Sequence, residues 1–258
     1  MIELLKGDCL EVMKGIPSGS IDAIITDPPY GTTACKWDSV IDFDLMWEQL
    51  NRIIKPNGAI VLFGSEPFSS AVRMSNVKNY KYDWIWDKVL PVGHLVSRYR
   101  PMQRSELISV FSDGACSYTK KGNKMEYNPI MEKRLSPRKY IASTSKSELV
   151  NNHTMSEDYK RDDYVERYPT NILGLSNANR NNRLHPTQKP VALMEYLIKT
   201  YTNENDTVLD FTMGSGSTMV AAKNTNRSGI GIEMDADYFK TASERVNYTE
   251  PQKTIPFD

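Results

Sequence analysis

A run of apolar residues that ends on two prolines is the feature that most constrains the fold of this chain. Residues 21–26 read IDAIIT and lead directly into Asp27-Pro28-Pro29-Tyr30. Such a run is typical of a strand buried on both faces of a parallel sheet, and the prolines end it because neither can donate a backbone hydrogen bond. Since open α/β sheets bind ligands beyond the carboxyl ends of their strands, we expect residues 27–30 to lie at a binding site.

Apolar patterns towards both ends of the chain predict alternating strands and helices. Strands are expected at 2–5, 59–63, 207–211 and 228–233, and helices at 43–54, 191–201 and 235–246. Between them the sequence is rich in Asn, Ser, Arg, Lys and Tyr, and it contains one clear strand pattern, at 105–111. We therefore predict a single α/β domain built from residues 1–89 and 185–258, with an insert at residues 90–184.

Positive charge collects in this insert. The formal net charge of the whole chain is zero, but residues 88–189 hold 18 Lys and Arg against 10 Asp and Glu, and acidic residues are in excess on both sides. A basic segment of this kind favours contact with a polyanion such as nucleic acid. The alternative is a solvated surface insert with no partner.

A glycine-rich turn follows the predicted strand at 207–211. Gly214 and Gly216 would let the backbone approach a ligand, and the helix start that follows offers free N–H groups. Glu233 ends the next predicted strand, where a carboxylate can bind ribose hydroxyls. Met219 replaces the third glycine of the dinucleotide fingerprint and no P-loop motif is present, which favours an adenosine ligand such as S-adenosylmethionine. A purely structural turn is the alternative.

The residues at 27–30 suit an amino group attached to an aromatic ring. The Asp27 carboxylate and the Pro28 carbonyl can together accept both hydrogens of an –NH2 group, and Tyr30 can stack on a flat ring. The lone pair of such an amine is delocalised, so the amine is a poor nucleophile. Two acceptors localise that lone pair and stabilise the positive charge that grows as the nitrogen attacks a methyl sulfonium. Asp27 or solvent can then take the proton.

With these motifs the sequence resembles the DNA amino-methyltransferases that act on adenine N6 or cytosine N4. DPPY (27–30) resembles their catalytic motif, DFTMGSGST (210–218) their cofactor loop, and RLHPTQKP (183–190) the segment that precedes that loop. The order of catalytic motif, target-recognition region and cofactor loop is that of their beta class. The resemblance implies a Rossmann-like domain with a seven-stranded, mostly parallel sheet and a reversed edge strand. It also implies S-adenosylmethionine as cofactor and double-stranded DNA as partner.

The resemblance assigns roles to individual residues. The catalytic group would be Asp27, Pro28, Pro29 and Tyr30. The cofactor would contact Asp8, Cys9, Asp27, His185, Pro186, Thr187, Lys189, Asp210, Phe211, Thr212, Gly214, Ser215, Gly216, Ser217, Thr218, Glu233 and Met234. DNA would contact Lys36, Trp37, Arg98, Arg100 and Arg104. Simpler interpretations remain for some of these: a helix cap for Asp8 or Lys189, a backbone hydrogen bond for His185, and a place in the core for Trp37.

The predicted function is methylation of adenine N6 after the base is flipped out of the duplex. Asp before Pro-Pro-Tyr is the usual adenine form in the resembling family. Cytosine N4 is the nearest alternative; methylation of RNA or of a protein glutamine, and a catalytically inactive DNA-binding protein, are others. A homodimer is expected by family analogy only, and so is a place in restriction–modification.

Composition sets further expectations. No apolar stretch approaches the ~18 residues of a membrane span, and the N-terminus does not resemble a signal peptide. Cys9, Cys35 and Cys116 form no Cys-x-x-Cys pair. We therefore expect no disulfide framework, no metal site and no membrane, and we expect a reducing cytoplasm.

Overall fold

The fold is described from a computed structural model, which covers residues 1–32, 39–117, 122–138, 164–177 and 188–248. The chain divides into two compact units, one of Met1–Asn128 with Asn171–Asp258 and one of Pro129–Thr170. The second unit contains β6 (Glu132–Arg138), which pairs antiparallel with β7 (Tyr164–Arg167). It lies inside the range predicted for the insert. No helix in the described ranges is both long and apolar enough to span a bilayer.

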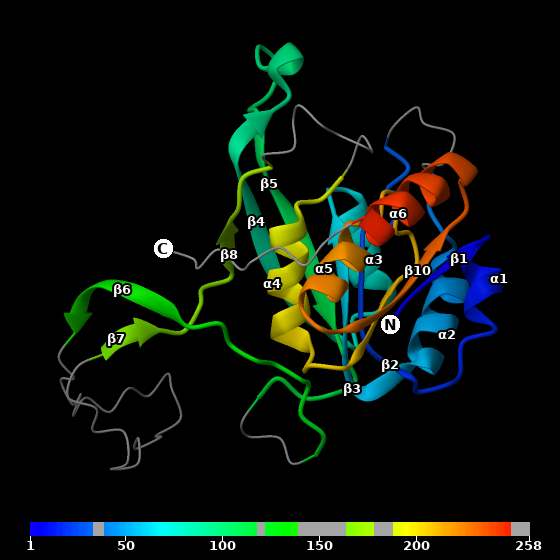
Figure 1. The fold of residues 1–258 in the computed structure, drawn as a ribbon. Helices are drawn as coiled ribbons and strands as arrows, with labels where there is room; N and C mark the ends of the chain where they lie inside the picture. The colour runs from blue at the N-terminus through cyan, green and yellow to red at the C-terminus, as the bar shows by residue number, and fades with distance from the viewer. Residues whose placement is uncertain (33–38, 118–121, 139–163, 178–187, 249–258) are drawn as a thin grey trace. The chain divides into compact units, whose positions relative to one another are not determined.

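An eight-stranded sheet forms the centre of the first unit (Figure 1). Its strands in spatial order are β1 (Ile2–Lys6), β10 (Ser228–Glu233), β9 (Thr207–Asp210), β2 (Ile21–Thr26), β3 (Ile54–Gly64), β5 (Gln103–Phe111), β4 (Tyr80–Val92) and β8 (Ile172–Gly174). Only β5 runs antiparallel to its neighbours. The prediction of a mostly parallel α/β sheet is therefore confirmed.

Two details differ from the predicted sheet. The described sheet has one strand more than the seven expected, because β8 pairs with the outer edge of β4 through Ile85 and Ile172. The reversed strand, β5, is consequently not at the edge: it lies between β3 and β4. Since β5 belongs to this sheet, part of the range predicted as insert contributes to the first unit.

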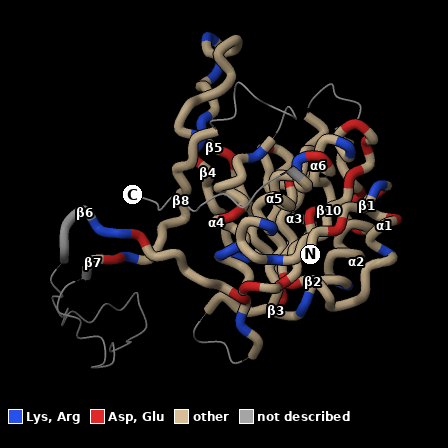
Figure 2. Tube along the Cα trace, viewed as in Figure 1, with Lys and Arg blue, Asp and Glu red and all other residues tan. Residues whose placement is uncertain are grey.

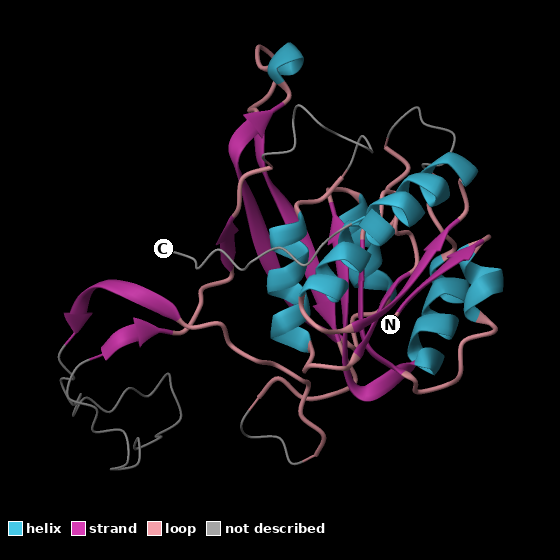
Figure 3. Cartoon of the chain, viewed as in Figure 1, coloured by secondary structure: helices cyan, strands magenta, loops and turns pink. Residues whose placement is uncertain are grey.

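Helices cover both faces of the sheet (Figure 3). They are α1 (Cys9–Met13), α2 (Phe43–Ile53), α3 (Phe68–Ser75), α4 (Val191–Tyr201), α5 (Ser217–Asn224) and α6 (Ala236–Tyr248). Strand β2 shows why its sequence is almost continuously apolar. Ile25 packs into the cluster that includes the buried face of α4, and Ile24 packs into the cluster on the opposite face, with Met46 and Leu50 of α2.

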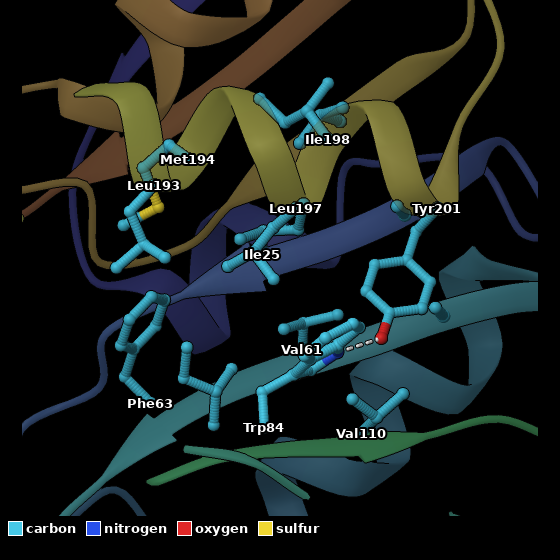
Figure 4. Close-up of a cluster of buried hydrophobic side chains, with 14 of the residues drawn as sticks. Ile25, Val61, Phe63, Trp84, Val110, Leu193, Met194, Leu197, Ile198 and Tyr201 are labelled. Atoms are coloured by element: carbon cyan, nitrogen blue, oxygen red, sulfur yellow. Dashed lines mark hydrogen bonds between the residues drawn. The ribbon is translucent and has the colours of Figure 1, made fainter. Parts of the chain in front are cut away.

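The core beneath α4 also buries polar aromatic side chains. Figure 4 shows Leu193, Leu197 and Tyr201 of α4 facing the strands. The Trp84 indole Nε1–H donates to the Tyr201 hydroxyl at 2.5 Å (Figure 4). A buried indole without a partner would cost about 1–3 kcal/mol, so this hydrogen bond lets a tryptophan fill the space at no such penalty. The packing holds α4, and with it the residues just before it, against the sheet.

Candidate active site

The predicted site residues meet where three neighbouring strands end. Strand β10 ends at Glu233, β9 ends at Asp210, and β2 ends at Thr26, just before Asp27. These strands are adjacent and parallel, so their carboxyl ends share one edge of the sheet. From β9 the chain continues outward to β10, and from β2 it continues the other way to β3. The crevice between β9 and β2 is therefore a topological switch point, the usual ligand site of such folds.

A cavity at this edge collects most of the predicted cofactor residues. Those lining it are Asp8, Cys9, Asp27, Lys189, Asp210, Phe211, Thr212, Gly214, Ser215, Ser217, Thr218, Glu233 and Met234. Pro29 lines it as well, whereas Pro28, Tyr30 and Gly216 are not among the lining residues. His185, Pro186 and Thr187 lie outside the described residues. Gln188 and Met213 lie within the motifs but were given no role of their own, and the sequence had not pointed to the other lining residues, which are Gly7, Ser39, Ile41, Met194, Ile232 and Tyr238.

Glu233 organises the glycine loop through its carboxylate. Oε2 accepts from the Gly214 backbone N–H at 2.9 Å, and Oε1 accepts from that of Asp235 at 2.8 Å. Gly216 has a φ of +78°, and a Cβ there would lie 3.1 Å from the Cβ of Ala242 in α6. The second glycine is therefore required by the turn and by the close approach of α6, and it acts on the cavity only through the shape of the loop.

Asp210 is buried and fully hydrogen-bonded. Its carboxylate accepts from the hydroxyls of Thr26 and Thr218, both at 2.6 Å, and from the Thr212 N–H at 3.2 Å. Burial raises the pKa of Asp210 to about 6, against the lowering effect of these three donors. The group is thus ionised at neutral pH at a cost to the folded state.

We expect Asp210→Asn to stabilise the protein at pH 8. A carboxyl whose pKa is higher in the folded than in the unfolded chain favours folding below its unfolded pKa, and that contribution is lost as pH rises through its folded pKa. A rise from 3.8 to about 6 corresponds to about 3 kcal/mol at most, which the neutral amide avoids. Urea unfolding at pH 8 and pH 5 checks this: the advantage of Asn should be clear at pH 8 and about half as large at pH 5.

Asp27 takes part in a buried network of charges. Tyr30 donates its hydroxyl to Asp27 Oδ1, and Lys189 Nζ lies 2.7 Å from Asp27 Oδ2. Lys189 Nζ also lies 2.6 Å from Oε1 of Glu106, whose Oε2 is 2.7 Å from Lys88 Nζ. Burial raises the pKa of Asp27, although Lys189 opposes the rise. Glu106 and Lys88 were missed from sequence; the signal was a glutamate inside the otherwise apolar strand pattern at 105–111.

Asp8 is a helix cap, as the simpler interpretation of the sequence had it, and a capping residue can still line the cofactor cavity. Asp8 caps α1, since its Oδ1 accepts from the Leu10 N–H at 2.9 Å and from the Glu11 N–H at 3.3 Å. The same residue lines the cavity. Its neighbour Cys9 is mostly buried, and burial raises the pKa of that thiol to about 11, so it stays protonated at neutral pH.

The predicted DNA-contacting residues have different surroundings. Arg98 and Arg100 are exposed in the connection between β4 and β5, whereas Arg104 pairs with Asp87 through two hydrogen bonds of 2.6 Å. Figure 2 shows basic residues at the far end of this hairpin. Because Leu107 of β5 pairs with Gly64 at the carboxyl end of β3, the hairpin extends from the edge of the sheet that holds the cavity. Lys36 and Trp37 lie outside the described residues.

The comparison with known proteins decides the family. A family model described as DNA methylase, of the N6/N4 type, matches residues 21–244. The chain belongs to this family. The methylase is 30% identical to the type II methyltransferase M.HpaI of Haemophilus parainfluenzae, over 95% of this chain and 74% of that protein. It is 28% identical to the type II methyltransferase M.HinfI of Haemophilus influenzae, over 96% and 69% respectively.

Solved structures agree with the fold of the methylase. The crystal structure of the M1.HpyAVI–SAM complex matches with a TM-score of 0.63 and 28% identity, covering 96% of this chain and all of that one. The cytosine-N4-specific PvuII DNA methyltransferase matches with a TM-score of 0.66 over 98% of this chain and 88% of its own, but at 16% identity it shows the fold alone. Membership of a DNA methylase family places the chain among DNA methyltransferases rather than among enzymes acting on RNA or protein.

Within the described ranges, no three His, Cys, Asp or Glu side chains are grouped so that they could hold a metal ion.

Proposed function

We propose that this methylase transfers a methyl group from S-adenosylmethionine to N6 of an adenine flipped out of duplex DNA. The observation that carries the proposal is the meeting of two features in one cavity. The Asp27 carboxylate follows β2, and the glycine loop with Glu233 follows β9 and β10. The solved relative with a bound SAM supports the choice of methyl donor.

The chemistry of the cavity fits this cofactor. Glu233 uses two acceptor sites on backbone amides, which leaves further lone pairs for ribose hydroxyls. Phe211 and Met234 supply apolar surface for the adenine, and Asp8 supplies an acceptor beside them. The backbone between Gly214 and Ser217 would shape the methionine end. When bound, S-adenosylmethionine supplies a methyl group activated by a sulfonium centre.

The chain's own groups would prepare the target nitrogen. Asp27 and the carbonyl of Pro28 would accept the two amine hydrogens, which localises the nitrogen lone pair and stabilises the growing positive charge. Neither proline offers a competing N–H donor at this point of the chain. Asp27 or solvent would then hold the released proton.

The choice of adenine as the target base rests on the Asp-Pro-Pro-Tyr form of the motif. The test must therefore distinguish methylation of adenine from methylation of cytosine. Duplex DNA without methylated bases would be incubated with the protein and S-adenosylmethionine, digested to nucleosides and analysed by mass spectrometry. N6-methyldeoxyadenosine is expected. Detection of N4-methyldeoxycytidine instead would show that the target base is cytosine. The absence of any methylated nucleoside would favour an inactive DNA-binding protein. Single-molecule sequencing of the same DNA would give the recognition sequence.

DNA contact is proposed for the β4–β5 hairpin and for the target-recognition region within residues 90–184, and the arginines of the hairpin allow a direct test. We expect Arg98→Gln and Arg100→Gln each to weaken DNA binding and to reduce the slope of log affinity against log salt by about one. Arg104→Gln is the matched control, since Asp87 already compensates its charge. Fluorescence anisotropy across a salt series measures the slopes; slopes for Arg98→Gln and Arg100→Gln equal to that of the unaltered protein would remove these two residues from the phosphate contacts.

A homodimer and a cytoplasmic location complete the proposal. The homodimer rests on family analogy only, and sedimentation of the full chain at several concentrations tests it; the cytoplasmic location is consistent with DNA as the substrate.

A further inference from the structure

A row of alternating charges begins at Asp27 and Lys189, which line the cavity. Its order is Asp27, Lys189, Glu106 and Lys88, with neighbouring charged atoms 2.6–2.7 Å apart. The side chains of Lys189 and Glu106 are only 8% and 5% exposed. They come from different parts of the chain: Lys189 precedes α4, Glu106 and Lys88 lie on β5 and β4, and Asp27 follows β2.

The surroundings of Asp27 disfavour the ionised form of its carboxyl group. Glu106 is a second buried carboxylate close by: the Tyr30 hydroxyl, which donates to Asp27, also lies 3.1 Å from Oε1 of Glu106. Asp210, at the end of β9, is a third carboxylate that interacts with Asp27. Burial and neighbouring acids both favour the protonated form of a carboxyl. A protonated Asp27 could not offer two acceptor oxygens, and it could not take a proton.

We propose that Lys189, anchored by Glu106, is a positioning residue that keeps Asp27 ionised and orients its carboxylate for the target amine. The inference rests on the proposed function, since it assigns Lys189 to the base side of the cavity rather than to the cofactor. Lys189 acts through Asp27 and need not touch the base itself.

Glu106 explains how Lys189 stays in place while Asp27 changes partners. Both oxygens of Asp27 already accept from the protein, so an incoming amine must share or displace one of these donors. Lys189 is held independently by Glu106 Oε1, which keeps the ammonium beside Asp27 during that exchange. Lys88 neutralises the other oxygen of Glu106. Together the two ammonium groups outweigh burial and lower the pKa of Glu106 to about 2.

Aromatic rings enclose the Lys189 ammonium. Its Nζ lies 5.0 Å from the ring centre of Phe63 and 5.9 Å from that of Trp86. The face of an aromatic ring attracts a cation, and the apolar walls keep water from screening the charge. Although burial alone would lower the pKa of Lys189, the two carboxylates raise it above its usual value, so the side chain stays charged.

The test is a carbon-13 NMR titration of aspartate carboxyl groups in the free protein, with the Asp27 signal assigned by its loss in Asp27→Asn. Lys189→Met removes the positive charge and should raise the Asp27 pKa by about one unit or more. Glu106→Gln removes a negative charge and should lower it. Lys55→Met is the matched control: it breaks the ion pair with Asp22 near the opposite end of β2 and should leave Asp27 unchanged.

Measurements of activity and of cofactor binding distinguish an effect of Lys189 on Asp27 from a direct role of Lys189 in binding the cofactor. Since methyl transfer needs ionised Asp27, the acidic limb of its pH profile should move to higher pH in Lys189→Met and to lower pH in Glu106→Gln. Binding of S-adenosylhomocysteine should change little. An Asp27 pKa unmoved in Lys189→Met overturns the inference, and if Lys189→Met also loses cofactor binding, Lys189 is a cofactor residue instead. Absence of methyl transfer by the unaltered chain overturns the proposed function and not the titration result.

Discussion

Asp27→Ala is expected to abolish methyl transfer while leaving cofactor binding nearly unchanged. The substitution removes the group proposed to accept an amine hydrogen and to stabilise the positive charge on the attacking nitrogen. Losing one such preorganised group typically lowers kcat by about 10²–10³-fold, and losing a proton acceptor adds to this. The Lys189 ammonium, still held by Glu106, would also lie beside the amine without the negative charge of Asp27 to offset it. We therefore expect a loss of at least about 10³-fold in single-turnover rate.

The control lies on the same strand. Asp22 is also a partly buried carboxylate of β2; it pairs with Lys55 and accepts from the Thr207 N–H, but it is near the other end of the strand. Asp22→Ala should lower stability without lowering the rate of methyl transfer in the folded fraction. Calorimetry with S-adenosylhomocysteine should give Kd values within a few-fold for the unaltered protein and both variants. An Asp27→Ala protein that retains normal turnover would refute the proposed mechanism.

The sequence predicted the central strands that are buried on both faces, but it missed β4 as well as the short β6, β7 and β8. Strands β2 and β3 appear as nearly unbroken apolar runs because helices cover both sides of them. Strand β4 alternates instead: Trp84 and Trp86 are buried, while the residues between and beyond them are more accessible. This alternation is a strand signal in its own right, but it lies where the domain boundary was drawn, near residue 90. The boundary therefore separated β4 from β5, which are paired in the sheet.

The site was predictable where topology alone assembles it. Once strands ending at Thr26, Asp210 and Glu233 are parallel neighbours, their terminal residues must meet at one edge. The charge row was not predictable in this way. Tyr30 and Glu106 are 76 positions apart, and their contact depends on β5 being inserted antiparallel beside β3. A sequence pattern records that Glu106 is an acid in an apolar strand, but its partner follows only from the register of that strand.

Glu233→Ala is expected to raise the Kd for the cofactor by about two orders of magnitude. Hydrogen bonds to a charged acceptor contribute about 1.5–3 kcal/mol each, and the carboxylate has free lone pairs for two ribose hydroxyls. Loss of two such bonds corresponds to at least about 3 kcal/mol, or about 100-fold in affinity. Calorimetric titration with S-adenosylhomocysteine measures the change directly.

The substitution also removes the acceptor for two backbone amides, so its effect on loop structure must be separated from its effect on ribose. Asp235 allows this, because its Oδ1 accepts from the N–H groups of Asp237 and Tyr238 at the start of α6, and it does not line the cavity. Asp235→Ala should cost about 1 kcal/mol of stability, as loss of a helix cap does, and leave the Kd nearly unchanged. If both variants weakened binding equally, Glu233 would matter through the order of the loop alone, and the adenosine end of the cofactor would have to be placed elsewhere in the cavity.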